Sequence, residues 1–349
     1  MPDDPSLFPY QTVAVTGGTG SFGWAFLTHL RHHFPDVFVR IISRHEDLQV
    51  QMRAAFGDDH ISYLLGDVRD PDRMRMAMRG VDLVVHAAAL KHVDRGEYEP
   101  WEFLSTNVTG TYNVIHAAIM AGVQQVVMLS SDKAVVPINL YGASKMAAER
   151  LTVQSNHYSP HGTRLCVSRY GNIMGARGSV LLAWQDALLR GQKLSLTDAR
   201  MSRFFMTIHE AVRLVLWTAT HGLRGGIAVP HLPAFKMTDL ARAMCTGQSQ
   251  FGWGITGRRP GEKLAETLLT DEEQERCYWY GPSDNNLVCY VIPPLTQGWG
   301  AADERALWAM PPTDLMYGTI LPEHQVPYRS DTWRWQLGVE DLQERLSTI

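Results

Sequence analysis

The sequence has few cysteines and no signal segment. Its 349 residues include four cysteines, Cys166, Cys245, Cys277 and Cys289, whose spacing is neither that of a metal site nor that of a Cys-x-x-Cys pair. No apolar signal segment precedes Val13, the start of the first apolar run. We therefore expect reduced thiols, no bound metal and a cytoplasmic protein.

An excess of charge of one sign and long apolar runs are also missing. The chain carries 32 Lys and Arg against 36 Asp and Glu, a net charge of −4, so no basic field indicates nucleic acid or an anionic membrane as partner. No stretch reaches the roughly 18 uninterrupted apolar residues of a membrane span, because His86 already breaks the run from Val84 to Leu90. We expect neither nucleic-acid binding nor membrane insertion.

Short runs rich in Val and Ile alternate with longer segments of helical period from Thr12 onward. With 45% hydrophobic and 19% charged residues, this pattern is typical of an ordered α/β protein whose parallel sheet is covered by helices. It predicts a Rossmann-like, doubly wound parallel sheet with a smaller C-terminal α/β substrate-binding domain. The predicted strands are Val13–Thr16, Phe38–Ser43, Ile61–Gly66, Leu83–Ala87, Val126–Ser130 and Leu165–Tyr170.

The alternation weakens after Asn172, where Gly, Pro, Arg and Trp become frequent. Loops and short elements of this kind are expected where a second domain covers a substrate. The expected parts are a nucleotide-binding Rossmann domain over 8–171 with a returning segment at about 203–225, a substrate-binding domain over 172–202 and 226–290, and a C-terminal extension over 291–349, packed on the domain or at an interface.

A glycine-rich segment directly follows the first predicted strand and opens a helix. Glycines in this context let backbone N–H groups approach a pyrophosphate at the helix N-terminus, although an ordinary tight turn is the alternative. The residues predicted to hold a dinucleotide here are Gly17, Thr19, Gly20, Ser21, Phe22 and Gly23.

The second strand indicates which dinucleotide to expect. It ends at Ser43 and Arg44, with no acid to bind the ribose 2′-hydroxyl of NAD and with a cation for a 2′-phosphate, so NADP is favoured. Arg44 as a solvated surface charge is the alternative. We expect the adenine near Asp67 and Val68. The small residues predicted to lie along the cofactor after the fourth strand are Ala87, Ala88 and Ala89.

Tyr141 and Lys145 are spaced i, i+4 on a predicted helix and therefore share one face. We expect the Lys145 ammonium to lower the pKa of the Tyr141 phenol, so that the phenolate can take a proton from a substrate hydroxyl. The Lys145 position also belongs to the predicted cofactor site. A surface Tyr stacked on a Lys stem is the alternative.

A hydroxyl, a carboxyl group and an amine follow one another at the end of the fifth strand, in Ser131, Asp132 and Lys133. The carboxyl ends of parallel strands are where such folds bind ligands. A simple dehydrogenase needs only the hydroxyl, whereas an acid beside an amine suits the removal of a C–H proton and the expulsion of hydroxide. These residues therefore favour a dehydration, with a solvated turn pair as the alternative.

The chain resembles the UDP-N-acetylglucosamine 4,6-dehydratases in the polysaccharide-biosynthesis branch of the extended short-chain dehydrogenases, particularly the soluble C5-inverting enzymes that begin pseudaminic acid synthesis. The likeness spans roughly residues 12 to 270. The motifs that carry it are Thr16–Gly23, Gly66–Asp70, Ala87–Val93, Ser131–Ala134, Pro137–Lys145, Arg169–Asn172, Arg200–Phe204 and Arg259–Glu266.

This resemblance implies a lyase that uses the machinery of an oxidoreductase. Tyr141 would deprotonate the sugar 4-hydroxyl as C4 gives hydride to NADP+. Lys133 would then remove the C5 proton while Asp132 protonates the departing 6-hydroxyl. Hydride would return to C6 and a proton would add to the other face of C5, giving the inverted 4-keto-6-deoxy sugar. The chain departs from the soluble pattern at Ser131, where the family usually carries Thr, and at Val135–Val136.

The resemblance also implies the substrate contacts. Fork-shaped Arg donors suit a diphosphate, a Glu can accept from ribose hydroxyls, and the segment after the fourth strand would line the sugar pocket. For each of these side chains, a structural role is the alternative. The candidates are Lys91, His92, Asn172, Arg203, Arg259 and Glu262.

Two other functions remain open at this point. A UDP-sugar 4-epimerase or reductase would use the same Tyr141 and Lys145 but would have no use for Asp132 and Lys133. An NADP-binding regulator could keep the fold without the chemistry, although such proteins commonly lose the Tyr or the Lys. The family forms homo-oligomers, so we expect one here.

Overall fold

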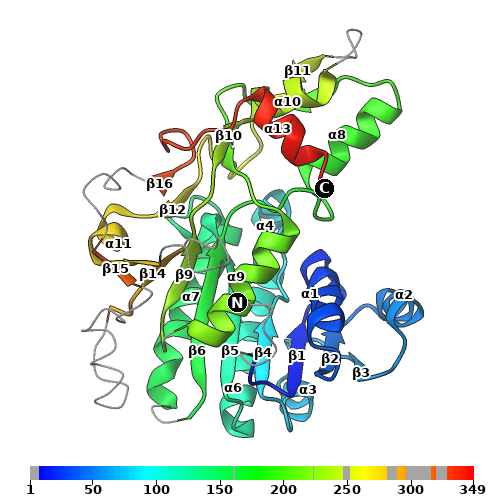
Figure 1. The fold of residues 1–349 in the computed structure, drawn as a ribbon, viewed down its shortest axis with the longest axis vertical. Coiled ribbons are helices and arrows are strands. Elements are labelled where there is room, and N and C mark those ends of the chain that lie inside the picture. The colour runs from blue at the N-terminus through cyan, green and yellow to red at the C-terminus, as the bar shows by residue number, and fades with distance from the viewer. Residues whose placement is uncertain are drawn as a thin grey trace.

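A ten-stranded sheet lies at the centre of the chain, in the order β15-β13-β14-β9-β6-β5-β4-β1-β2-β3 (Figure 1). The computed structural model describes residues 8–159, 162–222, 224–246, 252–280, 289–295, 316–319 and 328–349. The seven strands from β3 to β9 run parallel, and β14, β13 and β15 continue the sheet antiparallel. The order 3-2-1-4-5-6 is that of a Rossmann fold, so the predicted fold class is confirmed.

The predicted strands agree closely with the observed ones, because both faces of the sheet are covered and its strands therefore read as continuous apolar runs. The strands of the large sheet are β1 (Thr12–Thr16), β2 (Phe38–Ser43), β3 (Ile61–Leu65), β4 (Leu83–His86), β5 (Gln125–Ser131), β6 (Arg164–Tyr170), β9 (Ile227–Pro230), β13 (Tyr278–Tyr280), β14 (Cys289–Ile292) and β15 (Met316–Thr319).

The helices follow the strands in the manner of a doubly wound fold. After β4 the chain forms several short turns in place of one long helix, because Pro100 lacks the N–H that would continue α4. The helices and turns are α1 (Ser21–His33), α2 (Glu46–Phe56), α3 (Pro71–Ala77), α4 (Val93–Tyr98), α5 (Pro100–Phe103), η2 (Leu104–Thr109, π-helical), α6 (Gly110–Ala121), η3 (Asp132–Ala134), α7 (Leu140–Gln154), η4 (Ser155–Tyr158), α8 (Val180–Leu189), α9 (Ile208–His221), α10 (Met237–Cys245), α11 (Asp271–Arg276) and α13 (Val339–Leu346).

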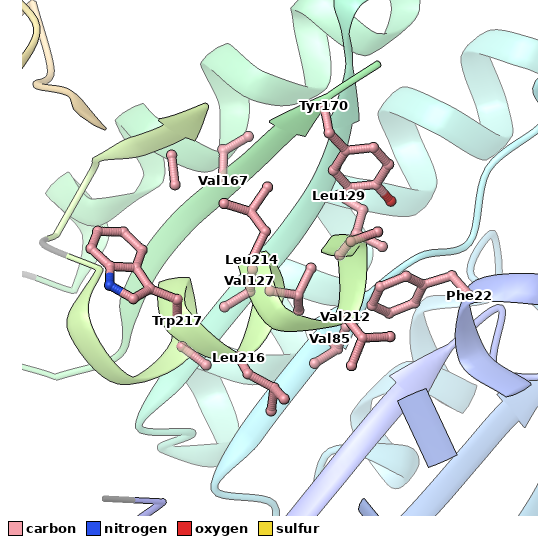
Figure 2. Close-up of a cluster of buried hydrophobic side chains, with 14 of the residues drawn as sticks. Phe22, Val85, Val127, Leu129, Val167, Tyr170, Val212, Leu214, Leu216 and Trp217 are labelled. Carbon is pink, nitrogen blue, oxygen red and sulfur yellow. The ribbon is translucent and has the colours of Figure 1, made fainter. Parts of the chain in front are cut away.

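Alternate residues of the strands feed two cores on opposite faces of the sheet. Val127 packs on one face with residues of α1 and α9, whereas its neighbour Val126 packs on the other with residues of α3 and α6. Figure 2 shows Val212 and Leu214 of α9 packed against the strands on the face that carries Val127. This packing makes the sheet a rigid base for its carboxyl-terminal edge.

A smaller unit lies beyond that edge and has its own core (Figure 1). Trp184 of α8, Phe235 of the strand before α10, and Leu240 of α10 contribute to this core. The remaining described strands pair in three small sheets. They are β7 (Leu194–Leu196) with β11 (Trp253–Ile255), β8 (Ser202–Phe204) with β10 (Ala234–Lys236), and β12 (Thr267–Leu269) with β16 (Tyr328–Arg329).

The segment expected to form the second domain over 226–290 is divided between the two units. Its β9, β13 and β14 lie in the large sheet and β12 packs on the core of that sheet, whereas α10 and β11 belong to the core of the smaller unit. From the C-terminal extension over 291–349, β15 joins the large sheet and α13 packs on α10, and its residues 296–315 and 320–327 lie outside the described part. Among the described residues, no helix is both long enough and apolar enough to cross a membrane.

A buried ion-pair network ties α7 to the sheet. Arg169 of β6 is 3% exposed and bonds Glu149 of α7 at 2.8 Å and Glu273 of α11 at 2.7 Å. Burial alone would lower the pKa of the guanidinium, but the two carboxylates outweigh that effect and raise it. The network fixes the helix that carries Tyr141 and Lys145.

We predict that Arg169→Met lowers the free energy of unfolding by about 3–5 kcal/mol, because it leaves two buried carboxylates without their cation. Arg190→Met is the matched control. Arg190 pairs with Asp186 at an exposed position, with side chains 66% and 57% exposed, and its loss should cost about 1 kcal/mol or less. Urea denaturation of both variants measures the difference, and equal stabilities would contradict the structural role of Arg169.

Candidate active site

A cavity of about 750 Å³ follows the carboxyl-terminal edge of the parallel strands. All but one of the residues predicted to hold a dinucleotide line it. Those that do are Gly17, Thr19, Gly20, Ser21, Phe22, Ser43, Arg44, Asp67, Val68, Ala87, Ala88, Ala89, Tyr141 and Lys145. The cavity therefore joins the glycine-rich segment to the helix that carries the Tyr and the Lys.

The glycine-rich loop has no room for side chains at two of its positions. Gly17 has a φ of +65°, and a Cβ there would lie 2.8 Å from the backbone of Ala88. Gly23 does not line the cavity, but a Cβ there would lie 2.1 Å from the carbonyl oxygen of Gly18, so its absence lets α1 pack on the loop. No side chain caps the amino end of α1, whose first N–H groups can therefore bind an anion.

Charged side chains stand where the second and third strands end. The Arg44 side chain is 39% exposed, and its Nη1 lies 3.8 Å from Oδ2 of Asp67. Asp67 is bound more closely by Arg69, at 2.7 Å. Burial would raise the pKa of Asp67, but the Arg69 hydrogen bonds outweigh it and lower the pKa. Among the described residues, the shortest ion pair of Arg44 is therefore this 3.8 Å contact, which leaves its guanidinium accessible from the cavity.

A segment from beyond β6 closes over the glycine-rich loop. The Arg177 guanidinium donates to the carbonyl oxygen of Thr19, and the Arg177 backbone N–H donates to Ser21 Oγ at 2.9 Å. The Lys91 ammonium in turn donates to the Arg177 carbonyl oxygen at 2.7 Å. Nothing in the sequence singled out Arg177, since the contact joins segments far apart along the chain.

Asp132 and Lys133 meet where the first cavity joins a second one of about 320 Å³. Lys133 Nζ lies 3.0 Å from Asp132 Oδ1 and 3.1 Å from Oδ1 of Asn172, and it lines both cavities. Asp132 is fully buried, and its Oδ1 also accepts from Ser131 Oγ at 2.8 Å. The carboxyl group therefore lies behind Ser131 and Lys133, the two groups that reach the first cavity.

Charge around Lys133 sets its protonation. Burial would lower the pKa of the ammonium, but the carboxylates of Asp132 and Glu266 outweigh that effect and raise it above its usual range. The free enzyme therefore holds Lys133 as a cation. A base at this position must first lose its proton to a neighbour.

Tyr141 and Lys145 line the same cavity, as their helical spacing predicted. Burial raises the pKa of Tyr141, and the Lys133 cation opposes this, with a hydrogen bond from Ser131 acting in the same direction. Lys145 Nζ donates to the carbonyl oxygen of Leu129, and burial lowers its own pKa to about 8. The effect of Lys145 on the Tyr141 phenol stays a prediction.

The second cavity lies between the large sheet and the smaller unit. Two of its cations are engaged with backbone: Arg203 donates to the carbonyl oxygens of Ser202, Lys263 and Leu264, and Lys91 donates to Arg177. All the residues expected to contact substrate line this cavity, namely Lys91, His92, Asn172, Arg203, Arg259 and Glu262.

Glu266 is a site residue that the sequence reading did not assign. It is 1% exposed, lines the second cavity, and places Oε1 3.3 Å from Lys133 Nζ. Its place at the end of the Arg259–Glu266 motif was the feature of the sequence that could have indicated a role in the site. A carboxylate was not expected there, because the distance to Lys133 depends on how β12 packs against the end of β5.

A family model described as polysaccharide biosynthesis protein matches residues 13–283. The chain belongs to this family. It is 40% identical to the UDP-N-acetylglucosamine 4,6-dehydratase (inverting) of Campylobacter jejuni strain 81-176 over 276 residues, which are 78% of this chain and 81% of the relative. The membership predicted from the motifs is confirmed.

Other relatives in the family carry a different name. The UDP-glucose 4-epimerase of Rickettsia akari is 41% identical over 300 residues, 82% of this chain and 86% of the relative. Among solved structures, Pen from Bacillus thuringiensis has a TM-score of 0.83 at 32% identity and covers 98% of this chain and 100% of its own. DesIV from Streptomyces venezuelae, a dTDP-glucose 4,6-dehydratase with NAD bound, matches the fold with a TM-score of 0.65 at 24% identity over 72% of this chain and 86% of its own.

We predict that Gly23→Ala weakens dinucleotide binding by roughly tenfold or more, about 1.4 kcal/mol, because the new methyl group must push α1 away from the loop. Gly254→Ala is the matched control, since a Cβ at Gly254 meets nothing within 4 Å. Calorimetric titration of both variants with NADP+ and NAD+ measures the effect. Wild-type affinity in Gly23→Ala would show that the loop does not hold the nucleotide.

Proposed function

We propose that this chain is a UDP-N-acetylglucosamine 4,6-dehydratase that inverts C5. The observation that carries the proposal is the pair of Asp132 and Lys133, 3.0 Å apart at the junction of the two cavities. Tyr141 lines the first cavity beside them, so a base for a sugar hydroxyl and a base for a sugar C–H share one site. The inverting relative at 40% identity supports the same reaction.

NADP is the cofactor we propose for the first cavity. The size of the cavity, the glycine-rich loop and the uncapped amino end of α1 fit a dinucleotide, and Arg44 fits the 2′-phosphate. The buried hydroxyls of Thr106 and Ser130 line the cavity without a hydrogen-bond partner among the described residues, so they are free for a ligand. When bound there, this cofactor would supply reversible hydride transfer.

Oxidation at C4 depends on Tyr141. Its buried phenol takes the proton of the sugar 4-hydroxyl, and the positive charge of Lys133 favours the phenolate that this step requires. The Ser131 hydroxyl is placed to hydrogen-bond the 4-oxygen. Lys145 lines the same cavity, and its hydrogen bond to the Leu129 carbonyl oxygen fixes the ammonium there, where it would help to hold the cofactor.

Elimination across C5 and C6 depends on a proton exchange within the pair. Transfer of one proton from Lys133 Nζ to Asp132 along their hydrogen bond produces a neutral amine and a carboxylic acid together. The amine removes the C5 proton, which the 4-ketone has made acidic. Asp132 supplies the proton with which the 6-hydroxyl leaves as water, and this proton reaches the cavity through Ser131 or Lys133.

The UDP part of the substrate belongs in the second cavity. Arg259 is an exposed residue that lines this cavity, and its guanidinium can donate two hydrogen bonds to the diphosphate. Glu262 contacts Thr197 and can accept a hydrogen bond from a ribose hydroxyl. Arg203 holds the segment that carries them through its bonds to the carbonyl oxygens of Lys263 and Leu264. Its role is therefore to position that segment as well as to face the ligand.

The cytoplasm is the compartment we propose, because its thiols stay reduced. The four cysteines all lie in the described part of the chain and form no disulfide there, and burial raises the pKa of the Cys166 thiol to about 11 and that of Cys277 to about 12. These thiols are structural and unreactive.

A UDP-glucose 4-epimerase is the second candidate, since relatives at 41% identity carry that name. It would use Tyr141 in the same way. Proton removal at C5 has no part in epimerisation at C4, so the two functions differ in what they require of Asp132 and Lys133.

We predict that the enzyme incubated with UDP-N-acetylglucosamine in deuterated water yields a product that has lost water and carries deuterium at an inverted C5. NMR and mass spectrometry follow both changes. A product of unchanged mass with interconverted C4 would establish the epimerase instead.

In the same assay, Lys133→Met and Asp132→Asn should lower dehydration by at least about a hundredfold, as expected for loss of a general base or acid. Lys193→Met, at an exposed position outside both cavities, is the control and should retain wild-type turnover. Variants of the pair with full turnover would contradict the dehydration mechanism.

For the cofactor, we predict that Arg44→Ala weakens NADP+ binding by roughly tenfold to a hundredfold, since a hydrogen bond to a charged group contributes about 1.5–3 kcal/mol, while NAD+ binding changes little. Arg53→Ala removes an exposed arginine of α2 that does not line the cavity and serves as control. Calorimetry with both nucleotides gives the ratio, and an unchanged ratio would place the 2′-phosphate elsewhere.

A further inference from the structure

Glu266 is a buried carboxylate directed at the reaction centre. Its Oε1 lies 3.3 Å from Lys133 Nζ, and its Oε2 has no hydrogen-bond partner within the described part of the chain. Lys263 Nζ is 3.7 Å from Oε2, too far for a hydrogen bond, and donates instead to the Val135 carbonyl oxygen at 2.7 Å. A buried carboxylate oxygen that accepts no hydrogen bond lowers the stability of the fold, so its presence calls for an explanation.

The backbone of Glu266 is fixed from the far end of the chain. Its N–H donates to Ser330 Oγ at 3.0 Å, and the Ser330 N–H donates back to the Glu266 carbonyl oxygen at 2.9 Å. Ser330 is fully buried, and its hydroxyl also shares a hydrogen bond with Ser202. The pairing of β12 with β16 therefore holds the side chain of Glu266 in place beside Lys133.

We propose that Glu266 is a positioning residue that holds Lys133 over the sugar and makes its amine a stronger base toward the C5 proton. This inference rests on the proposed dehydration. Glu266 touches no reacting atom and acts through Lys133.

The charges that face these groups support this role. Asp132, Glu266, Arg203 and Tyr141 face Lys133, and Lys133, Lys263 and Tyr141 face Glu266. The Glu266 carboxylate lies 3.3 Å from the Lys133 ammonium and, together with Asp132, raises the pKa of Lys133. It also makes the neutral amine of Lys133 a stronger base, because the ammonium that forms is stabilised.

The proton balance of the step closes with these residues. One proton passes from Nζ to the Asp132 carboxylate, and the C5 proton then passes to Nζ. The C–H electron pair forms the double bond between C5 and C6 as the C6–O bond breaks, and the Asp132 proton leaves with that oxygen as water. Glu266 takes no part in this proton transfer.

Glu266→Gln tests the proposal, because it keeps the shape of the side chain and removes the charge. We expect kcat for dehydration to fall by roughly tenfold or more, and the alkaline limb of its pH profile to move to lower pH by about one unit, since the carboxylate no longer raises the pKa of Lys133. Oxidation at C4 should persist. Reduced nicotinamide should therefore accumulate in stopped-flow absorbance, which a merely misfolded site would not produce.

Two further variants complete the test in the full-length enzyme. Glu266→Asp keeps the charge but places it one methylene farther from Lys133, so its kcat and pH shift should fall between those of wild type and Glu266→Gln. If Glu266→Gln fails to fold, Glu266→Asp is compared with wild type alone and should show a lower kcat and an alkaline limb at lower pH. Glu275→Gln makes the same chemical change at an exposed position of α11 and should match wild type.

The outcomes separate this inference from the proposed function. Wild-type enzyme that releases no water from UDP-N-acetylglucosamine would overturn both. Wild-type dehydration together with unchanged kcat and pH profile in a folded Glu266→Gln, or in Glu266→Asp where the Gln variant does not fold, would overturn the role of Glu266 alone.

Discussion

The turn after β5 and the segment Arg259–Glu266 hold each other in place, and both cavities depend on that contact. Lys263 binds the Val135 carbonyl oxygen, Asn139 donates to the carbonyl oxygen of Gly261 at 2.7 Å, and Glu266 faces Lys133. These contacts join the edge of the large sheet to the smaller unit. The groups that act on the sugar and the groups that bind its nucleotide are therefore parts of one polar network, and a displacement of either segment moves both.

Local capping gives this network its precision. The Asn139 side chain accepts from the N–H of Gly142, so α7 begins at Leu140 and places Tyr141 in its first turn. The same side chain reaches Gly261 with its amide nitrogen. One residue thus sets both the start of the catalytic helix and its distance from the substrate segment, while Arg169 holds the body of that helix to the sheet.

The sequence was most informative where a single local pattern determines the structure. Continuous apolar runs predicted β1 to β6, and the glycines predicted the loop before α1, because these depend on neighbours in the chain. The direction of Lys145 and the approach of Glu266 to Lys133 depend instead on long-range packing, and periodicity carries no signal for it. For the same reason the sequence assigned 226–290 to one domain, whereas the antiparallel pairing of β14 with β9 places part of it in the large sheet.

The contacts of Arg177 bear on how long the nucleotide stays. Its segment lies across the glycine-rich loop and is held by Thr19, Ser21 and Lys91 together, so the phosphate end of the first cavity opens only when all these bonds break. A catalyst that recovers its own oxidant at the end of each cycle has no need to exchange it. Slow release of a dinucleotide through this end would therefore cost such a catalyst no turnover.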